Sequence, residues 1–493
     1  MAFLERNANR GSVSTGFNIE NSVKLEPANS ENFSRTPSSN GNQQKFTFSS
    51  WVKFTRINSG VSQWSTLFGA GNYATNSPSF RITHNTNNSL QVSFYTNSQY
   101  TGYYRTDALH RDTAAWYHFV VAVDTTQGTN TNRVKMYVNG VLAPATSVVS
   151  HISQNYNTGV NTGIVHRVGA FNNTADSFVS EYVAETHFVD GQALAPTEFG
   201  EFDDDSGIWI PKEVDVTYGT NGFYLDYADA SDLGDDESGN GNDFAENNIA
   251  AADQATDSPT NNFAVGNILI SAGGYFVTTE GATKFVLGTA GPGNNIGGVS
   301  CLSTIAVSKG KWYMEMKNDL ANDSVDSYAR FGFVDVGTLE NGGIDGKVIA
   351  RPGSAGGAYF GGTGGGRYHY NNTAQGSSTA WIRQIMGMAL DLDNKKVYFH
   401  IDGTYTNSGD PANGTDNAGQ YEMNTGGDGI YVDETWVLGA SAYNLGIFLM
   451  NWGGYTVMPI SSAATDANGY GTFEYAPPSG YYALCSKNLA EYG

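Results

Sequence analysis

Large apolar and small polar residues alternate in short runs along the first half of the chain. The run 46–54 (FTFSSWVKF) alternates through Phe48, after which its apolar register shifts. This shift fits either a bulge or a strand that is covered on both faces. Residues 90–94 (LQVSF) alternate throughout, and residues 116–123 (WYHFVVAV) form a nearly continuous apolar run. A period of two residues predicts β-strands rather than helices.

The clearest turn signal lies between two such runs. The run 133–138 (RVKMYV) is followed by Asn139-Gly140, and apolar residues resume directly after this pair. Asn-Gly is the strongest short-range signal for a two-residue hairpin turn. Residues 116–142 are therefore expected to form two antiparallel strands followed by a hairpin at Asn139-Gly140.

The second half contains further runs of strand length. They are GKWYMEM (310–316), ARFGFV (329–334), IMGMALDLD (385–393), VYFHIDG (397–403) and GIFLMNWG (446–453). Residues 229–262 separate the two halves. This segment is acidic and rich in turn-forming residues, with almost no aliphatic alternation, and these properties predict a linker.

Composition supports an all-β protein and excludes other classes. Charged residues make up 15% of the 493 residues, hydrophobic residues make up 40%, and 60 residues are glycine. Helical bundles and coiled coils need Ala, Glu, Lys, Leu and Arg at helical spacing. Disordered chains have few apolar and aromatic residues, and collagen needs glycine at every third position. None of these profiles is present.

The charge and cysteine content indicate which binding partners and which cysteine chemistry to expect. The chain has 48 acidic and 26 basic residues and a net charge of −22, without a cluster of Lys and Arg. We therefore expect no nucleic-acid partner. A bare acidic glycan would be repelled unless divalent cations bridged it. No apolar stretch of eighteen residues and no secretory signal are visible, so neither membrane insertion nor signal-directed export is expected. Cys301 and Cys485 are expected to be two buried core thiols.

Five segments of the first half fall in the order of a known family. They are SVKLEPANSENFS, FTFSSWVKF, WYHFVVAVD, VKMYVNGVL and VSEYVAETHFVDGQALAPTEF. They resemble the laminin G-like branch, often called LamG-3, of the concanavalin A-like jelly rolls. That family has a Trp-bearing second strand, a Trp-x-His strand, a Tyr-x-Asn-Gly hairpin and a closing strand before a short helical turn. The resemblance covers about residues 20–205.

The second half resembles the SPRY (B30.2-like) family over about residues 300–455. The shared pattern is G-K-x-Y-x-E, G-F, I-G-x-A-L-D-L-D, V-x-F-x-x-D/N-G and a terminal L-N-F-G. Asp402 stands where Asn is commoner, and both residues accept the backbone angles of a turn. Trp452 stands in place of Phe in the last motif. SPRY domains are also concanavalin A-like sandwiches.

Together the two resemblances imply an all-β chain of two concanavalin A-like jelly-roll β-sandwiches joined by an acidic linker. The expected segments are an N-terminal arm (1–20), a laminin G-like sandwich (21–228), the linker (229–262) and a SPRY-like sandwich (263–493). This combination also resembles virion structural proteins of tailed bacteriophages of aquatic bacteria, of the tail-fibre, spike or head-fibre type. The resemblance implies a chain made in the host cytoplasm and exposed on the virion. Its implied partners are other virion proteins, with a homo-oligomer, a trimer being common for fibres.

Two tyrosine clusters are the candidate ligand-binding residues. Carbohydrate sites use aromatic ring faces together with amide and hydroxyl hydrogen bonds. We expect both clusters to lie on loops, with packing beneath loops or at a subunit interface as the alternative. The candidates are Tyr100, Tyr103 and Tyr104 in the first half, and Tyr359, Tyr368 and Tyr370 in the second.

The acidic segment raises the question of a metal. Asp232, Asp235 and Asp236 are weak calcium candidates, because calcium takes six to eight oxygen ligands. Their spacing does not fit an EF-hand loop, so a solvated linker is favoured and a structural calcium ion is the alternative. No other cofactor is expected.

Signals for catalysis are weak. Glu181 and Glu185 have the i, i+4 spacing of a strand-borne carboxylate pair but lack the central Asp of the sandwich glucanases. No Gly-x-Ser-x-Gly motif is present. His118 and His400 are interpreted as core or sheet-face histidines, and the glycine-rich run 361–367 as a sandwich loop rather than a phosphate site.

The favoured function is therefore a non-enzymatic virion protein whose sandwich loops bind host-surface glycans or envelope proteins. One alternative is an architectural decoration or adaptor protein that binds other virion subunits. The other alternative, which the missing carboxylate pair disfavours, is a glycan depolymerase.

Overall fold

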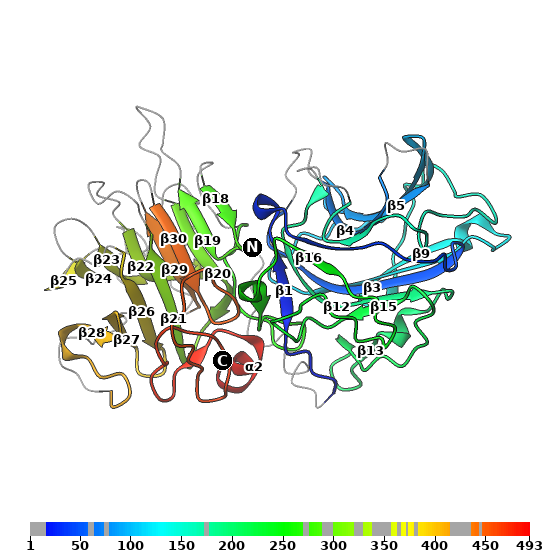
Figure 1. Cartoon of the computed structure of the whole chain (residues 1–493). Helices are drawn as coiled ribbons and strands as arrows, with labels where there is room; N and C mark the ends of the chain where they lie inside the picture. Colours follow the sequence, from blue (N-terminus) through cyan, green and yellow to red (C-terminus); the bar gives the residue numbers. More distant parts are fainter. Residues whose placement is uncertain are drawn as a thin grey trace. The chain divides into compact units, whose positions relative to one another are not determined.

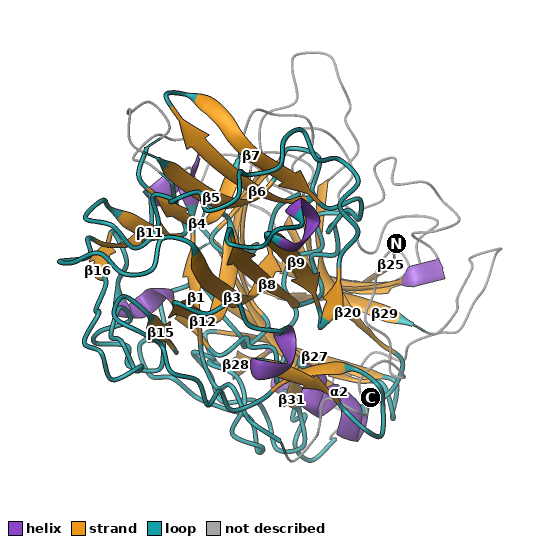
Figure 2. Ribbon diagram, turned by 90° about the vertical axis from the view of Figure 1, so that its right-hand side faces the viewer, coloured by secondary structure: helices purple, strands orange, loops and turns teal. Residues whose placement is uncertain are grey.

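A computed structural model provides the fold of the chain. It describes residues 16–57, 64–72, 78–171, 177–269, 276–287, 299–319, 329–337, 356–361, 366–370, 373–378, 383–414, 435–442 and 446–493. Two compact units divide this chain, with the first ending at Thr260 and the second beginning at Asn261 (Figure 1). Nearly all regular structure in the described residues is β-strand (Figure 2), as expected.

The first unit is built from two large antiparallel sheets. The eight-stranded sheet contains, in spatial order, β10 (Val141–Leu142), β9 (Val134–Val138), β8 (Tyr117–Asp124), β3 (Lys45–Phe54), β12 (Glu181–Asp190), β1 (Ser22–Leu25) and β17 (Gln254–Ala255), with β15 (Phe223–Leu225) also paired to β12. The seven-stranded sheet contains β16 (Ala245–Asn247), β2 (Asn32–Arg35), β11 (His166–Val168), β4 (Ser65–Ala70), β5 (Ser79–His84), β6 (Leu90–Thr96) and β7 (Gln99–Arg105). A small separate pair joins β13 (Gly200–Phe202) to β14 (Trp209–Pro211).

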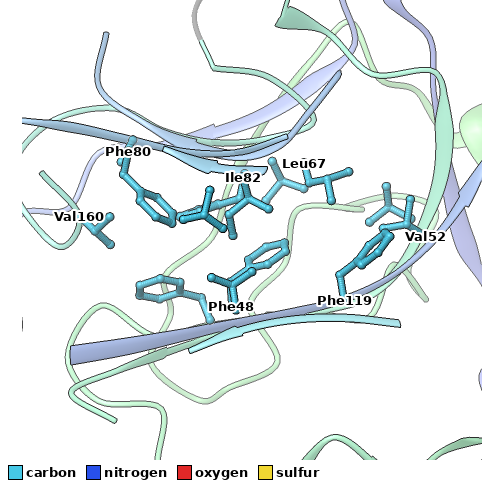
Figure 3. Close-up of a cluster of buried hydrophobic side chains, with 14 of the residues drawn as sticks. Phe48, Val52, Leu67, Phe80, Ile82, Phe119 and Val160 are labelled. Atoms are coloured by element: carbon cyan, nitrogen blue, oxygen red, sulfur yellow. The ribbon is translucent and has the colours of Figure 1, made fainter. Parts of the chain in front are cut away.

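The hydrophobic core of the first unit lies between these two sheets (Figure 3). Phe48 and Phe119 point into it from the eight-stranded sheet, and Phe80 and Ile82 point into it from the seven-stranded sheet. Each such side chain contributes roughly 1.5–3 kcal/mol on burial. The alternation read from the sequence thus produces a two-sheet sandwich.

Strand β3 shows why the pattern around Phe48 breaks. Residues 45–54 form one continuous strand, and Trp51 on its outer face is only 5% exposed. The ring of Trp51 stacks on His118, which in turn stacks on Trp209 of β14. The strand is therefore covered on both faces, which was one of the two predicted explanations.

The predicted hairpin is present. Strands β8 and β9 pair antiparallel, and β9 and β10 are joined by Asn139 and Gly140. Both turn residues have positive φ, 47° and 77°. This is the conformation that a type I′ turn requires and that Asn-Gly favours.

The acidic segment 229–262 is not a linker, and the predicted boundary at residue 228 is wrong. Strand β16 pairs with β2, and β17 pairs with β1, so this segment adds strands to both sheets of the first unit. The N-terminal arm is also anchored where it is described, because the Ile19 amide donates to Thr260 Oγ1. The sequence misled because these strands are two and three residues long and are held mainly by polar contacts.

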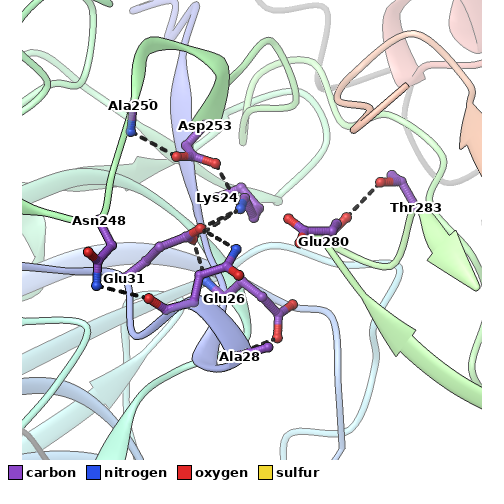
Figure 4. A network of polar contacts seen from close by, with 10 residues as sticks. Lys24, Glu26, Ala28, Glu31, Asn248, Ala250, Asp253, Glu280 and Thr283 are labelled. Atoms are coloured by element: carbon purple, nitrogen blue, oxygen red, sulfur yellow. Dashed lines mark hydrogen bonds and ion pairs between the residues drawn. The ribbon is translucent and has the colours of Figure 1, made fainter. Parts of the chain in front are cut away.

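Buried ion pairs fix this segment. The ammonium of Lys24 contacts Glu31 at 2.9 Å and Asp253 at 2.8 Å (Figure 4). Asp253 also accepts a hydrogen bond from the Ala250 amide. Asp253 therefore serves as a counter-ion inside the sandwich, rather than as a solvated linker charge.

The second unit is also a two-sheet structure. Its eight-stranded sheet contains β18 (Phe276–Thr279), β19 (Lys284–Leu287), β30 (Gly446–Asn451), β21 (Lys311–Asn318), β26 (Ile385–Asp391), β27 (Lys396–Ile401) and β28 (Thr404–Tyr405), with β31 (Tyr482–Ala483) pairing in parallel to β21. Its six-stranded sheet contains β20 (Val299–Val307), β29 (Trp436–Ala442), β22 (Ala329–Asp335), β23 (Gly356–Gly361), β24 (Gly366–Tyr370) and β25 (Thr373–Ser378). Helix α2 (Ser486–Tyr492) ends the chain, and short 3-10 helices are η2 (Pro27–Asn29), η3 (Asn130–Asn132), η5 (Pro196–Glu198), η6 (Ala251–Asp253) and η7 (Thr406–Ser408).

The SPRY-like motifs form strands of this second unit, and their apolar residues form its core. Trp312, Phe333 and Trp452 are buried in one cluster. Cys301 and Cys485 are free and buried, as expected. Among the described residues, no helix has both the length and the apolar character needed to cross a membrane.

Candidate functional site: the outer face of the seven-stranded sheet

The candidate site lies on the side of the seven-stranded sheet that faces away from the core. In β5, Phe80 and Ile82 point into the core, so Arg81 between them points outward. Pairing then places other outward residues beside Arg81, because directly opposed residues of adjacent strands share a face.

One row of outward residues crosses five strands in register. Arg167 of β11 lies opposite Gly69 of β4, and Gly69 lies opposite Arg81. The row continues from Arg81 to Ser93 of β6 and then to Tyr103 of β7. Neighbouring strands are about 4.8 Å apart, so Arg167 and Tyr103 each lie about 10 Å from Arg81 along the row.

Aromatic rings surround the guanidinium of Arg81. Its Cζ lies 4.6 Å from the ring centre of Trp64, 5.1 Å from that of Tyr95 and 5.5 Å from that of Phe171. Cation–π contacts of this kind contribute roughly 0.5–2 kcal/mol each. The three rings hold the guanidinium in place, although it makes no ion pair with any carboxylate of the described residues.

Gly69 provides the room for this arrangement. A Cβ at this position would lie 2.8 Å from Cδ2 of Phe171, closer than carbon atoms approach one another. The absence of a side chain lets Phe171 lie on the sheet between the two arginines of the row. Arg167 donates a hydrogen bond of 3.4 Å to the carbonyl of Phe171.

A tyrosine cluster borders Arg81 at the edge of the sheet. The ring centre of Tyr100 lies 4.6 Å from that of Tyr95 and 5.0 Å from that of Tyr103, with the last pair edge to face. Tyr100 is 43% exposed, whereas Tyr95 and Tyr103 are largely buried. Burial raises the pKa of Tyr95 and of Tyr103, so both hydroxyls remain protonated at neutral pH.

Polar side chains also lie on the outer face next to the row from Arg167 to Tyr103. Gln91 lies opposite Arg105, and its amide donates to Ser93 Oγ at 2.6 Å while it accepts a hydrogen bond from Asn85 at 2.7 Å. These contacts fix the Gln91 amide. Gln91 and Ser93 are themselves fully buried, so the groups that this face exposes are the ring of Tyr100 and the partly exposed arginines.

The structure changes the interpretation of the first tyrosine cluster. Residues 99–105 form edge strand β7 and not a loop. Tyr100 and Tyr103 lie on the outer face as described, but Tyr104 belongs to the core, where its hydroxyl accepts a hydrogen bond from the Ile152 amide. A strand sends successive side chains to opposite faces, so Tyr103 and Tyr104 cannot contact one ligand together.

The second tyrosine cluster is only partly described. Tyr359 lies in β23 and Tyr368 and Tyr370 lie in β24, where Tyr359 and Tyr368 are directly paired. The backbone there is therefore extended strand, whereas loops were expected. The side chains of these three tyrosines lie outside the described residues.

The calcium candidates do not converge. Asp232 and Asp235 are exposed, whereas Asp236 is buried and accepts hydrogen bonds from the amides of Tyr224 and Asn242. Within the described ranges, no group of three or more His, Cys, Asp or Glu side chains is placed to hold a metal ion.

The two glutamates of β12 point to opposite faces. Glu181 pairs with Leu25 and Phe54, which face the core, and both of its carboxyl oxygens lack a hydrogen-bond partner. A bulge follows Ala184, and Glu185 beyond it accepts a hydrogen bond from Tyr224 on the outer face. Burial raises the pKa of Glu181 well above its ordinary value. The pair therefore lacks the facing geometry that glycoside hydrolysis needs.

A serine–histidine contact in β3 and β8 is structural. Ser49 Oγ lies 2.8 Å from His118 Nε2, and the indole of Trp209 donates to His118 Nδ1 at 3.0 Å. Because Nδ1 must accept, the neutral ring carries its proton on Nε2 and donates it to Ser49. His118 therefore cannot act as a base toward this serine, and burial lowers its pKa to about 3.

His400 of the second unit is also buried, as expected. Its Nε2 lies 2.6 Å from the Tyr313 hydroxyl, which also contacts Glu315 at 3.0 Å. Glu315 accepts hydrogen bonds from the backbone amides of Glu474 and Tyr475 as well. This network joins the C-terminal segment to β21. Both carboxylate oxygens of Glu315 accept hydrogen bonds within it, and the side chain is fully buried.

Sequence reasoning missed the arginines of the outer face. The alternation of SFRITH in β5 could have indicated that Arg81 points away from the core. Its proximity to Trp64 and Phe171 could not, because these contacts depend on the strand register.

Comparison with known families finds one match, in the first unit. The laminin G family described as the concanavalin A-like lectin/glucanases superfamily matches residues 28–185. A search of the curated proteins returned no relative. Among solved structures, domains LG4-5 of the mouse laminin alpha1 chain share 8% identity, with 97% of this chain and 100% of that chain covered at a TM-score of 0.30.

Two further solved structures are similar to parts of the chain. The SPRY domain of human HERC1 shares 10% identity, with 39% of this chain and 99% of that chain covered at a TM-score of 0.25. A putative carbohydrate binding protein from Bacteroides ovatus shares 14% identity, with 47% and 59% covered at a TM-score of 0.30. Regular structure in the described residues is mainly β-strand, and residues 28–185 are similar to the laminin G-like, concanavalin A-like family.

Proposed function

We propose that this chain is a non-enzymatic glycan-binding protein whose site is the outer face of the seven-stranded sheet. The observation that carries the proposal is the partly exposed guanidinium of Arg81 in this row, with the exposed ring of Tyr100 beside the Tyr95 ring that it contacts. Sugars present C–H groups to aromatic rings and hydroxyls to amides and guanidinium groups, and this face offers both kinds of partner.

A binding role suits this face better than catalysis. No carboxylate lies in the described row from Arg167 to Tyr103, and glycoside hydrolysis in most families needs two. Incubation with a bound polysaccharide should therefore release no oligosaccharide. Release of oligosaccharides would favour a depolymerase instead.

The biological setting that we propose is the surface of a bacteriophage virion. There, a homo-oligomer would present several copies of the face to a host-cell glycan, and multivalency would strengthen weak individual contacts. Association with purified virions in immuno-electron microscopy tests this setting.

An architectural role is the second candidate, and edge strand β10 favours it. Val141 and Leu142 are 59% and 54% exposed on this two-residue strand, and exposed apolar edges commonly mark contacts with other chains. If this edge is the functional surface, Val141→Lys should abolish capture of other virion subunits. Under the glycan proposal, it should leave glycan binding intact.

The direct test of glycan binding uses a matched pair of exposed aromatic residues. Tyr100→Ala removes an exposed ring from the proposed site, whereas Phe202→Ala removes a 49% exposed ring from β13, which belongs to neither large sheet. On a glycan array followed by titration calorimetry, Tyr100→Ala should weaken binding about tenfold. Phe202→Ala should bind as the unaltered chain does. Equal affinities of both variants would overturn this site.

A further inference from the structure

The outer face carries positive charge in a protein whose net charge is −22. Arg81, Arg105 and Arg167 all point away from the core on strands β5, β7 and β11. None of the three forms an ion pair with a described carboxylate. The residues paired with them across the sheet are Ser34, Gly69, Gln91 and Ser93, and none is acidic.

The guanidinium of Arg81 is prepared for an anion. It is half-buried among three aromatic rings, and it makes no hydrogen bond within the described chain. Its Nε atom is buried and has no hydrogen-bond partner, but its two Nη atoms are not buried in this way. An Nη end that reaches solvent can contact both oxygens of one carboxylate side by side.

The rings increase the strength of such a contact. A guanidinium that is already clamped loses little conformational freedom when it binds, and the rings displace water from it. Tyr100 and Arg105 lie on β7, which is separated from β5 by β6, and from there they can contact the sugar ring that bears the carboxylate or its neighbour.

We infer that this face selects glycans that contain sugar carboxylates, with Arg81 receiving the carboxylate. The inference rests on the proposed glycan-binding function and gives it a substrate class. It reverses the expectation, drawn from net charge alone, that acidic glycans are repelled, because the local charge of this face is opposite to the overall charge.

The test uses oligouronates (oligogalacturonate and oligoalginate) and their methyl esters, which retain the sugar backbone but lose the charge. Titration calorimetry with the full chain should show at least tenfold tighter binding of the acids than of the esters. The preference should decrease as salt rises, because counter-charges screen the contact. Arg81→Gln should remove the preference, and Arg81→Lys should retain only part of it.

Lys135→Gln is the matched control, because it removes one positive charge from the outer face of β9 on the other sheet. It should leave the preference unchanged, and thermal melting should show that each variant is folded. Arg105→Gln provides a second test if Arg81→Gln unfolds, and it should weaken acid binding several-fold.

The outcomes separate the inference from the function on which it rests. Equal binding of acids and esters that still depends on Tyr100 would overturn the inference and leave glycan binding intact. Binding of neither class, on these probes or on an array of neutral and carboxylated glycans, would overturn both.

Discussion

The ammonium of Lys53 lies 2.6 Å from the carboxylate of Asp257, although 204 positions separate them in the sequence. Both side chains are essentially inaccessible to solvent. Trp116 donates a hydrogen bond to the other carboxylate oxygen of Asp257 at 3.0 Å. The acidic segment is therefore an integral part of the first sandwich.

Removing one partner of this pair should strongly destabilise the first unit. Asp257→Ala leaves the Lys53 ammonium buried without its counter-ion, which costs roughly 3–5 kcal/mol. Asp232→Ala, in the same segment but exposed, should change the free energy of unfolding by less than about 0.5 kcal/mol. Chemical denaturation of both variants checks the prediction. Similar stabilities would indicate that the segment is not part of the folded unit.

The same contacts predict where the first unit can be cut. A fragment of residues 16–260 should fold cooperatively, because it retains β16, β17 and the counter-ions Asp253 and Asp257. A fragment of residues 16–228 lacks all of these and should be unfolded or molten. Near-ultraviolet circular dichroism and thermal melting distinguish the two. A cooperative melt of the shorter fragment would contradict this boundary.

Glu181 and Glu185 should respond in opposite ways to replacement by Leu. A buried carboxyl without hydrogen bonds costs roughly 1–3 kcal/mol, so Glu181→Leu, among Leu25 and Phe54, should stabilise the unit by a similar amount. Glu185→Leu deprives the Tyr224 hydroxyl of its acceptor and should destabilise it. Unfolding measured at pH 7.5 provides the comparison. Destabilisation by Glu181→Leu would show that this carboxyl has a structural partner.

Acid should destabilise the first unit below pH 6.5. In four of its buried histidines, burial lowers the pKa, to about 3 for His84 and His118 and to about 4 for His110 and His166. The unfolded chain binds these protons near pH 6.5, so acidification favours unfolding by about 2 kcal/mol per histidine between pH 6.5 and 5.

Glu31 opposes this trend. Burial raises its pKa to about 7, so its contribution to stability is present in acid and is lost as pH rises toward 7. Glu181 acts in the same direction, because burial raises its pKa well above the ordinary value. These two carboxyls offset only part of the effect of four histidines. The melting temperature should therefore be lower at pH 5 than at pH 7. An unchanged or higher melting temperature at pH 5 would mean that these histidines are accessible or paired when protonated.

Local patterns explain which parts of the fold the sequence predicts. The hairpin at Asn139 and Gly140 is readable because its turn needs two adjacent residues with positive φ. The pairing of Lys53 with Asp257 is not readable, because many acidic residues near position 257 are equally plausible partners by sequence. Acidity and turn-forming residues describe both a linker and a well-anchored irregular segment.

In the candidate site, too, some residues could be predicted from local sequence and others could not. Tyr100 and Tyr103 are identified by their aromatic density, but the alternation that sends Tyr104 into the core is hidden by Gly102 and by the bulge in the β6–β7 pairing. The position of Arg81 beside Tyr95 follows from strand register, which depends on pairing across the whole sheet.

The most direct test of the central claim is a crystal structure of the full chain with a bound oligouronate. We predict sugar density on the outer face of β5, β6 and β7, with a carboxylate within about 3 Å of Arg81 and a sugar ring against Tyr100. Sugar bound at another surface of the first unit, or in the second unit, with Arg81 unoccupied would contradict it.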